Sequence, residues 1–445
     1  MTGVQTCALP ILHLDERRFQ WIKHLKKERL DRRSNTVTLS TLELLKLHAF
    51  ENIEIHSEKK EEGEQSRKLL RELTELRPPD EPNLIGLKSI LRPYQEIGVR
   101  WLWFLYNYAL SGLLCDDMGL GKTHQTMALF QAVHNHHLQL GEKKRFHFLV
   151  VCPTSVIYHW QEKLREFLPN LRVWTFYGVN RSLETFYEEC DILLTSYGVW
   201  RNETEELSKL SFEVAVFDEI QIAKNYLSRI HGALLKVNSQ MRLGLTGTPI
   251  ENRLRELKSL FDIVLPTYMP SEHDYREFFV SPIEKEADQQ RKQLLSRLIK
   301  PFVLRRKKET VLLDLPEKTE EIAHCDLMPE QRQLYIDVLT SSRDKIIHEL
   351  EDEKTPVPYI HIFALLSHLK QICDHPAVFL KKPAEYKNYQ SGKWELFVEL
   401  LNEARDSQQK VVVYSQYLAM LDIIESYLNE LGIKYASIRG ATLKR

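Results

Sequence analysis

The sequence has no run of about 18 consecutive apolar residues, the length that a helix needs to cross a bilayer. It also has no charged and then apolar leader that ends in small residues, so neither a membrane partner nor secretion is expected. Its six cysteines lie far apart, with no C-x-x-C pair and no histidine at zinc-finger spacing. We therefore expect reduced, mostly buried thiols in an intracellular protein.

A strong charge of either sign is also missing. The chain has 61 Lys and Arg against 62 Asp and Glu, a formal charge of −1, so any case for nucleic acid must come from local motifs. With 43% hydrophobic and 28% charged residues, the composition argues against wholesale disorder. A chain of 445 residues exceeds one hydrophobic core, so two main domains are expected.

Both ends of the chain look unlike natural domain ends. Met1–Ile11, MTGVQTCALPI, lacks helical or strand periodicity and matches the translation of a sequencing-library adapter, so it is left out of fold reasoning. The chain stops at Arg445 within an α/β pattern, which predicts a fragment. Residues 12–82 are expected to form an N-terminal helical or accessory region and linker, with an amphipathic helix over Leu12–Arg33.

After residue 82, short apolar runs alternate with helical patterns. This texture predicts an α/β fold, because parallel strands buried on both faces read as continuous apolar runs joined by helical crossovers. The predicted strands lie at 149–153, 191–197, 213–219 and 242–249, with a further buried strand at Val411–Tyr414.

The strongest motif is Leu113–Thr123, LLCDDMGLGKT, where an apolar strand runs into a glycine-containing loop and then a helix. Such loops close backbone N–H groups around phosphates at a helix N-terminus. Lys122 would bridge the β- and γ-phosphates of ATP, and the Thr123 hydroxyl would bind Mg²⁺. The strict pattern has glycine where this chain has Asp116, and the alternative is a structural turn.

A second motif follows about a hundred residues later, where an apolar strand delivers Asp218 and Glu219 at its carboxyl end. Ligands of open α/β sheets bind at that edge. Asp218 suits a Mg²⁺ partner, and Glu219 suits the base that activates the attacking water. An isolated Asp-Glu pair would carry little meaning, but a preceding phosphate loop favours the functional interpretation.

Ten segments between residues 88 and 445 occur in an order that resembles Swi/Snf-type ATPases of helicase superfamily two, and the DEIQ form resembles the bacterial branch. They are LRPYQEIGVRWL (91–102), DDMGLGKTHQT (116–126), CPTSVIYHW (152–160), TSYG (195–198), DEIQ (218–221), LTGTPIENRLREL (245–257), PFVLRRKKETVLLDLPEK (301–318), LKQICDHP (369–376), SGKWELFVELL (391–401) and VVVYSQY (411–417).

The resemblance implies two RecA-like parallel-sheet domains with helical insertions, the second incomplete at its C-terminus. The expected bounds are 83–265 for the first lobe, 266–320 for a helical insertion and interlobe linker, and 321–445 for the second lobe. It also implies a DNA-dependent ATPase that uses ATP and Mg²⁺ and moves along double-stranded DNA through sequence-independent backbone contacts. A DNA-bound protein cargo is possible, in a bacterial cytoplasm or a eukaryotic nucleus.

Site residues carry over position by position. The resemblance assigns ATP binding to Gln95, which would read the adenine, and to Asp117, Met118, Gly119, Leu120, Gly121, Lys122, Thr123 and His124. It assigns catalysis to Lys122, Asp218 and Glu219, and the metal to Thr123 and Asp218. It assigns DNA contacts to Thr154, Ser155, Thr195, Ser196, Tyr197, Ser415, Gln416, Gly440 and Thr442, and coupling to Thr246, Gly247 and Thr248.

Several of these assignments have a plain structural alternative. Thr154 and Ser155 are as often a helix N-cap as a phosphate ligand, and 246–249 could be a simple Gly-Pro turn. For the basic stretch 304–308, LRRKK, contact with DNA phosphates and a role as a linker carry equal weight.

Two other functions stay open beside the translocase. One is a helicase that separates strands, and the other is a non-motor adaptor that binds DNA under the control of ATP. Intact Lys122, Thr123, Asp218 and Glu219 favour a working motor. The family's last motif supplies an arginine to the γ-phosphate and finds no match in this chain, so the chain alone is expected to hydrolyse ATP poorly.

Overall fold

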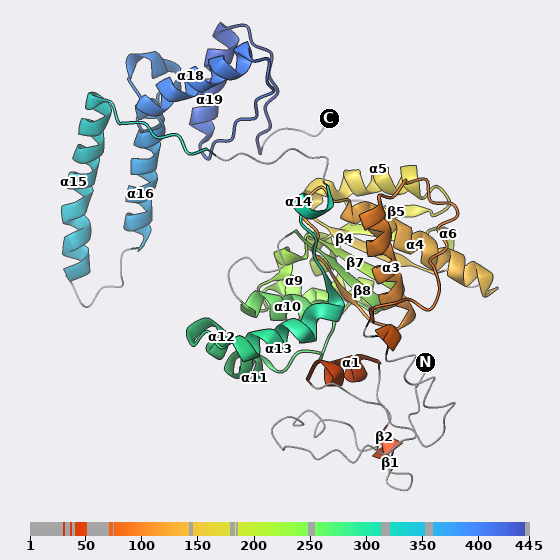
Figure 1. Cartoon of the computed structure of the whole chain (residues 1–445). Coiled ribbons are helices and arrows are strands. Elements are labelled where there is room, and N and C mark those ends of the chain that lie inside the picture. The colour runs from red at the N-terminus through yellow and green to blue at the C-terminus, as the bar shows by residue number, and fades with distance from the viewer. Residues whose placement is uncertain are drawn as a thin grey trace. The chain divides into compact units, whose positions relative to one another are not determined.

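In the computed structural model, the chain forms two compact units, residues 1–317 and 318–445 (Figure 1). It describes residues 30–31, 36–37, 41–50, 71–73, 75–141, 146–178, 183, 186–247, 254–312, 321–351 and 359–440. The predictions for Met1–Ile11, Thr248 and Thr442 fall outside these residues.

The first unit is built on a seven-stranded sheet in which every pair of neighbouring strands is parallel, in the order β5-β6-β4-β7-β8-β3-β9. All residues of β3, β4 and β6 are buried, as continuous apolar runs predict. The predicted α/β class with a RecA-like parallel sheet is thereby confirmed for this unit. The strands are β3 (Gly112–Leu114), β4 (Phe148–Cys152), β5 (Val173–Phe176), β6 (Ile192–Ser196), β7 (Phe212–Asp218), β8 (Ser239–Leu245) and β9 (Val303–Leu304).

Two groups of helices cover opposite faces of this sheet (Figure 1). Connections from β3 to β4 and from β4 to β5 run one way along the sheet and later ones run back, so right-handed crossovers place their helices on opposite sides. The first group is α3 (Pro93–Asn107), α4 (Lys122–Gln139) and α5 (Ile157–Phe167), which follows the short 3-10 helix η3 (Thr154–Val156). The second is α7 (Tyr197–Asn202), α9 (Arg229–Leu235) and α10 (Leu254–Val264).

Further helices lie in the connections of the first unit. They are α6 (Phe186–Glu189), α8 (Thr204–Leu207), η4 (Ile220–Ala223), α11 (Glu272–Tyr275), the π-helix η5 (Arg276–Val280), α12 (Ser281–Lys285), α13 (Gln289–Ile299), η6 (Lys300–Phe302) and α14 (Lys308–Val311).

The N-terminal region differs in part from its prediction. Leu30–Asp31 (β1) pairs antiparallel with Thr36–Val37 (β2), so the helix predicted over Leu12–Arg33 is wrong at these two residues. The β-branched pair in β2 offers a strand partner close in sequence, which competes with a helix. The rest of that prediction lies outside the described residues. Helix α1 (Thr41–Phe50) packs on α13.

The second unit is helical in its described part. Helices α15 (Pro329–Glu351) and α16 (Tyr359–Asp374) pack against each other, and a small core gathers Ala377, Val378, Tyr386, Met420, Ile423 and Ile424. The other elements are α17 (Pro376–Phe379), η7 (Pro383–Asn388), α18 (Gly392–Asp406) and α19 (Leu418–Glu430). Among the described residues of both units, no helix is long and apolar enough to span a membrane.

The buried strand predicted at Val411–Tyr414 is wrong. The segment forms no strand, and Tyr414 is 91% exposed. A buried strand needs neighbouring strands to satisfy its N–H and C=O groups, and residues 321–351 and 359–440 contain none. The apolar run alone therefore could not bury itself.

Candidate functional site

The predicted phosphate loop joins β3 to the N-terminus of α4. Gly121 adopts φ 75° as the N-cap of α4, a conformation that suits glycine, and the Gln95 amide occupies the space that a Cβ would need. Lys122 Nζ donates to the carbonyl of Asp116 at 2.7 Å and to that of Asp117 at 3.4 Å. The lysine ammonium is thus held over the loop at the positive end of an 18-residue helix.

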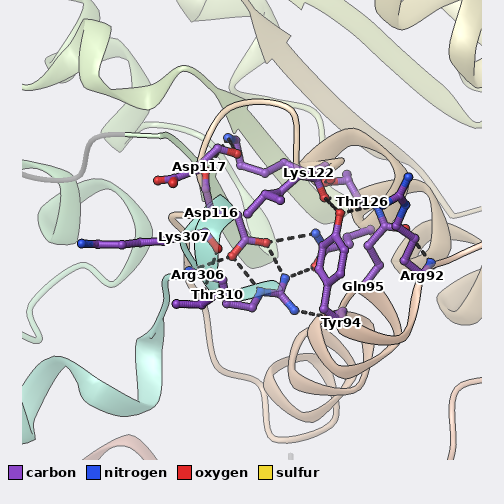
Figure 2. A network of polar contacts seen from close by, with 12 residues as sticks. Arg92, Tyr94, Gln95, Asp116, Asp117, Lys122, Thr126, Arg306, Lys307 and Thr310 are labelled. Atoms are coloured by element: carbon purple, nitrogen blue, oxygen red, sulfur yellow. Dashed lines mark hydrogen bonds and ion pairs between the residues drawn. The ribbon is translucent and has the colours of Figure 1, made fainter. Parts of the chain in front are cut away.

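Gln95, the residue predicted to read adenine, braces this loop. Its side chain is buried, accepts a hydrogen bond from Arg92 N at 2.8 Å and donates to the carbonyl of Leu120 at 3.1 Å. The Tyr94 hydroxyl donates to the same carbonyl at 3.1 Å (Figure 2). The start of α3 and the loop therefore form one hydrogen-bonded body, while the contact with adenine stays a prediction.

Asp116 shows why this loop departs from the strict glycine pattern. Its carboxylate is fully buried, and Arg306 binds it with its backbone N at 3.1 Å, with Nε at 2.9 Å and with Nη2 (Figure 2). Gln125 Nε2 also donates to it, at 3.1 Å. Within 304–308, Arg306 is thus an internal structural residue, whereas Arg305, Lys307 and Lys308 are exposed.

The remaining predicted ATP-binding residues surround the loop. Met118 and Gly119 are exposed, and Thr123 is half-buried at the first turn of α4. The Asp117 carboxylate accepts from Lys308 N at 3.0 Å. His124 Nδ1 lies 2.7 Å from the Ser89 hydroxyl, and burial lowers its pKa.

Asp218 and Glu219 lie at the carboxyl end of β7, two strands from β3 along the same edge. The indole N–H of Trp160 donates to Asp218 Oδ2 at 2.7 Å. Burial raises the pKa of Asp218, and the Trp160 hydrogen bond partly offsets this rise, as the Lys122 charge does to a smaller extent. The structure therefore places the predicted metal carboxylate at the same edge of the sheet as the phosphate loop.

Glu219 has a left-handed backbone, with φ 51° and ψ 49°, a conformation that costs a non-glycine residue free energy and is frequent at functional sites. Gln221 Nε2 donates to its carboxylate at 2.6 Å and orients it. The DEIQ motif thus supplies both the candidate base and the amide that holds it.

The residues present fit a Mg²⁺ ion bound together with a triphosphate. Thr123 offers a hydroxyl and Asp218 a carboxylate, and Mg²⁺ in such sites takes one or two protein oxygens beside phosphate oxygens and water. No group of three or more His, Cys, Asp or Glu side chains in the described ranges could hold a metal alone. The predicted coupling residues also adjoin the loop: Thr246 N donates to Leu114 O at 3.1 Å, and a Cβ on Gly247 would lie 3.3 Å from Met118 Cγ.

The predicted DNA contacts fall into two groups. In the first unit, Thr154 and Ser155 are exposed just before α5, and the N-cap positions of η3 and α5 are taken by Pro153 and Val156. By contrast, the side chains of Thr195, Ser196 and Tyr197 are buried and bonded within the unit, to Phe176 O, Val199 N and Asp218 O respectively. Ser196 is the N-cap of α7, so these three side chains have structural roles, and their contact with DNA stays a prediction.

In the second unit, Gln416 and Gly440 are exposed. Ser415 Oγ is half-buried and accepts from Tyr417 N at 3.2 Å.

Two functional neighbours escaped the sequence-based reasoning. Arg306 was assigned only to a basic stretch, and its partner Asp116 lies 190 residues away. Trp160 was only the last residue of the segment CPTSVIYHW, yet it donates a hydrogen bond to Asp218, 58 residues away. Each had a signal in the sequence. Asp116 stands where the strict motif has glycine, and a buried carboxylate needs a partner such as Arg306; the N–H of Trp160 likewise needs an acceptor when the ring is buried.

The chain is similar to known proteins over most of its length. A Bacillus subtilis protein, YwqA, is named as an ATP-dependent helicase/translocase. It is 36% identical to this chain over 400 residues, which cover 88% of this chain and 42% of YwqA. The TATA-binding protein-associated factor MOT1 of Saccharomyces cerevisiae is 36% identical over 66% of this chain and 17% of its own. This chain thus spans less than half the length of these relatives.

A solved structure, the Sulfolobus solfataricus SWI2/SNF2 ATPase core in complex with dsDNA, aligns with a TM-score of 0.49 and 33% identity over 79% of this chain and 73% of that one. The sequence profile of the SNF2-related domain matches residues 94–378, from the start of α3 into α17. This match covers more than half of the chain and confirms the resemblance, and the chain therefore belongs to the SNF2-related domain family.

Proposed function

We propose that this chain carries the ATP-binding machinery of a DNA-stimulated ATPase that moves along double-stranded DNA without separating the strands. The observation that carries the proposal is the convergence of two motifs at one sheet edge. Lys122 follows β3 on the phosphate loop, and Asp218 ends β7, two strands away at the same edge of the sheet, with Glu219 directly after it. ATP hydrolysis needs both parts at one place, because the loop binds the phosphates and the carboxylate activates the attacking water.

Each residue then has a chemical task. Backbone N–H groups of Gly119–Thr123 bind phosphate oxygens at the N-terminus of α4, and Lys122 neutralises the charge that develops on the transferred phosphoryl group. Glu219, oriented by Gln221, accepts a proton from the attacking water. Mg²⁺, when bound by Thr123 and Asp218, would neutralise the triphosphate.

Double-stranded DNA is the proposed track. The exposed Thr154 and Ser155 directly precede α5, and Trp160 of α5 donates a hydrogen bond to Asp218. DNA bound at Thr154 and Ser155 would therefore lie one or two helix turns from Trp160. The relative named as a helicase/translocase supports a motor, and the relatives named as factors associated with TATA-binding protein support a DNA-bound protein cargo.

The test is the ATPase rate of the full-length gene product without nucleic acid, with single-stranded DNA and with double-stranded DNA. We expect the largest stimulation by double-stranded DNA and no displacement of a paired strand. Glu219→Gln should keep Mg·ATP binding and lose turnover, while Lys122→Ala should lose turnover by weakening phosphate binding.

The outcomes separate the alternatives. Displacement of a strand in proportion to ATP consumed would establish a helicase. ATP-dependent DNA binding without turnover would establish a gated adaptor. Turnover by Glu219→Gln within a few-fold of the wild type would remove Glu219 from the role of base.

A further inference from the structure

The phosphate loop is held by a segment that comes from far along the chain, residues 303–308. Strand β9 pairs with β3, placing Val303 and Leu304 opposite Leu113 and Leu114. The backbone ladder then continues into the loop, because Cys115 N donates to Leu304 O at 2.6 Å and Asp117 N donates to Arg306 O at 3.1 Å. The segment therefore runs beside the first three residues of the loop and is hydrogen-bonded to two of them.

Arg306 is the centre of this attachment (Figure 2). Its guanidinium binds the Asp116 carboxylate through two nitrogens, donates to Gln125 Oε1 at 2.7 Å and reaches the carbonyl of Tyr94. The Arg306 side chain is only 12% exposed and that of Asp116 is fully buried. One side chain thus joins β9, the phosphate loop, α4 and α3.

Two glycines make room for the segment, which shows that the packing around it is built for this contact. A Cβ on Gly98 in α3 would lie 2.8 Å from Arg306 Nη2 and would overlap the Gln125 amide. A Cβ on Gly112 in β3 would lie 2.8 Å from the carbonyl of Phe302. A larger residue at Gly98 would displace the ends of the Gln125 and Arg306 side chains, and one at Gly112 would press on the backbone just before the segment.

The residue that Arg306 holds is also the one that positions Lys122. The Asp116 carbonyl accepts Lys122 Nζ at 2.7 Å, and the next residue, Asp117, is held by Lys308 N at 3.0 Å. The ammonium of Lys308 also lies beside the loop, 3.4 Å from where a Cβ on Gly119 would be. The same six residues therefore fix the backbone whose N–H groups and lysine would receive the phosphates.

We propose that Arg306 is a positioning residue for nucleotide binding, which acts through Asp116 to keep the phosphate loop in its phosphate-binding shape. The inference rests on the proposed function, since it concerns the same ATP site. It assigns to the LRRKK stretch a role at the nucleotide, whereas the sequence offered only DNA contact or a linker. In the proposed site, the loop contacts the phosphates of ATP and not its base. Loss of Arg306 should therefore weaken the affinity for Mg·ATP and leave the affinity for adenosine nearly unchanged.

The experiment compares Arg306→Gln with Arg305→Gln, the exposed neighbouring arginine, in the full-length gene product without DNA. Isothermal titration gives both the Kd for Mg·ATP and the fraction of molecules that bind, and competition gives the affinity for adenosine. We expect Arg306→Gln to raise the Kd for Mg·ATP at least tenfold with the bound fraction near that of the wild type. Adenosine affinity for this variant, and both affinities for Arg305→Gln, should change less than twofold.

A purely structural role would instead lower the bound fraction and leave the Kd of the folded molecules unchanged, and that result would overturn the proposal. An equal rise in Kd for Arg305→Gln would overturn it as well. If Arg306→Gln does not fold, the pair Asp116→Asn with Arg306→Gln removes both buried charges and is judged by the same criterion. Failure of the wild type to bind Mg·ATP would count against the proposed function itself.

Discussion

Trp160→Phe removes the indole N–H that donates to Asp218 and keeps a buried aromatic ring. Trp160 is 1% exposed, and its donor lies 2.7 Å from Asp218 Oδ2. A hydrogen bond to a charged group contributes about 1.5 to 3 kcal/mol, against about 0.5 to 1.5 kcal/mol for one between neutral groups. The lost ring volume adds a cavity term on top of either value.

Trp200→Phe is the matched control. Trp200 is also fully buried, and its indole donates at 3.1 Å to the carbonyl of Ala233, a neutral acceptor. Both variants lose the same atoms, so their cavity terms largely cancel. We therefore expect Trp160→Phe to lower the free energy of unfolding by about 1 to 1.5 kcal/mol more than Trp200→Phe does at neutral pH.

The assay is urea unfolding of both variants and the wild type at a series of pH values. The Trp160 donor lowers the pKa of Asp218 because it favours the ionised carboxylate. Its contribution is thus present above that pKa and is lost as the pH falls through it. The excess cost of Trp160→Phe should shrink with decreasing pH, and the acid limb of ATP turnover should move to higher pH. Equal costs for the two variants at every pH would refute the reasoning.

Three further predictions follow from the described residues. Asp218→Asn should raise the melting temperature while abolishing Mg²⁺-dependent turnover, because burial raises the Asp218 pKa and so opposes its charge; a lower melting temperature would contradict this. Burial lowers the pKa of His375 to about 4, so the second unit should lose up to about 3 kcal/mol as the pH falls from 6.5 to 4. Fluorescence of Trp394, 6.1 Å from the His375 ring, with Trp394→Phe as the blank, would report that loss, and a flat profile would argue against it. DNA binding by the full-length gene product should be independent of sequence and should weaken steeply with salt. The logarithm of the binding constant should fall by about 0.9 per tenfold rise in salt for each phosphate contacted. In competition binding, a preference for one sequence that persists at high salt would contradict this prediction.

The sequence predicted the first unit's sheet well because its signals are local. Strands β4, β6, β7 and β8 are apolar runs bounded by polar residues, and buried parallel strands need nothing else to be recognised. The phosphate loop and the Asp218-Glu219 pair were found for the same reason, since a strand end and the residues that follow it are adjacent in sequence. These motifs needed no knowledge of distant contacts.

What the sequence could not predict depends on residues far apart. Val411–Tyr414 has the composition of a buried strand, but burial also requires neighbouring strands, which the described part of its unit lacks. The roles of Arg306 and Trp160 depend on partners 190 and 58 residues away, and a single sequence carries no record of such pairs. The hydrogen bonds that Thr195 and Ser196 make inside the fold were also not foreseen: the Thr195 hydroxyl donates to Phe176 O, and the Ser196 hydroxyl caps α7, while their contact with DNA stays a prediction.

The attachment of β9 to the loop also sets an order of events during synthesis of the protein. A ribosome adds about 5 to 20 residues per second. The 190 residues that separate Asp116 from Arg306 therefore take on the order of 10 to 40 seconds to appear. Until then, β3 has no neighbour on one side and the Asp116 carboxylate has no guanidinium. By the positioning role proposed for Arg306, the nascent chain completes its nucleotide site only after residue 308 has left the ribosome.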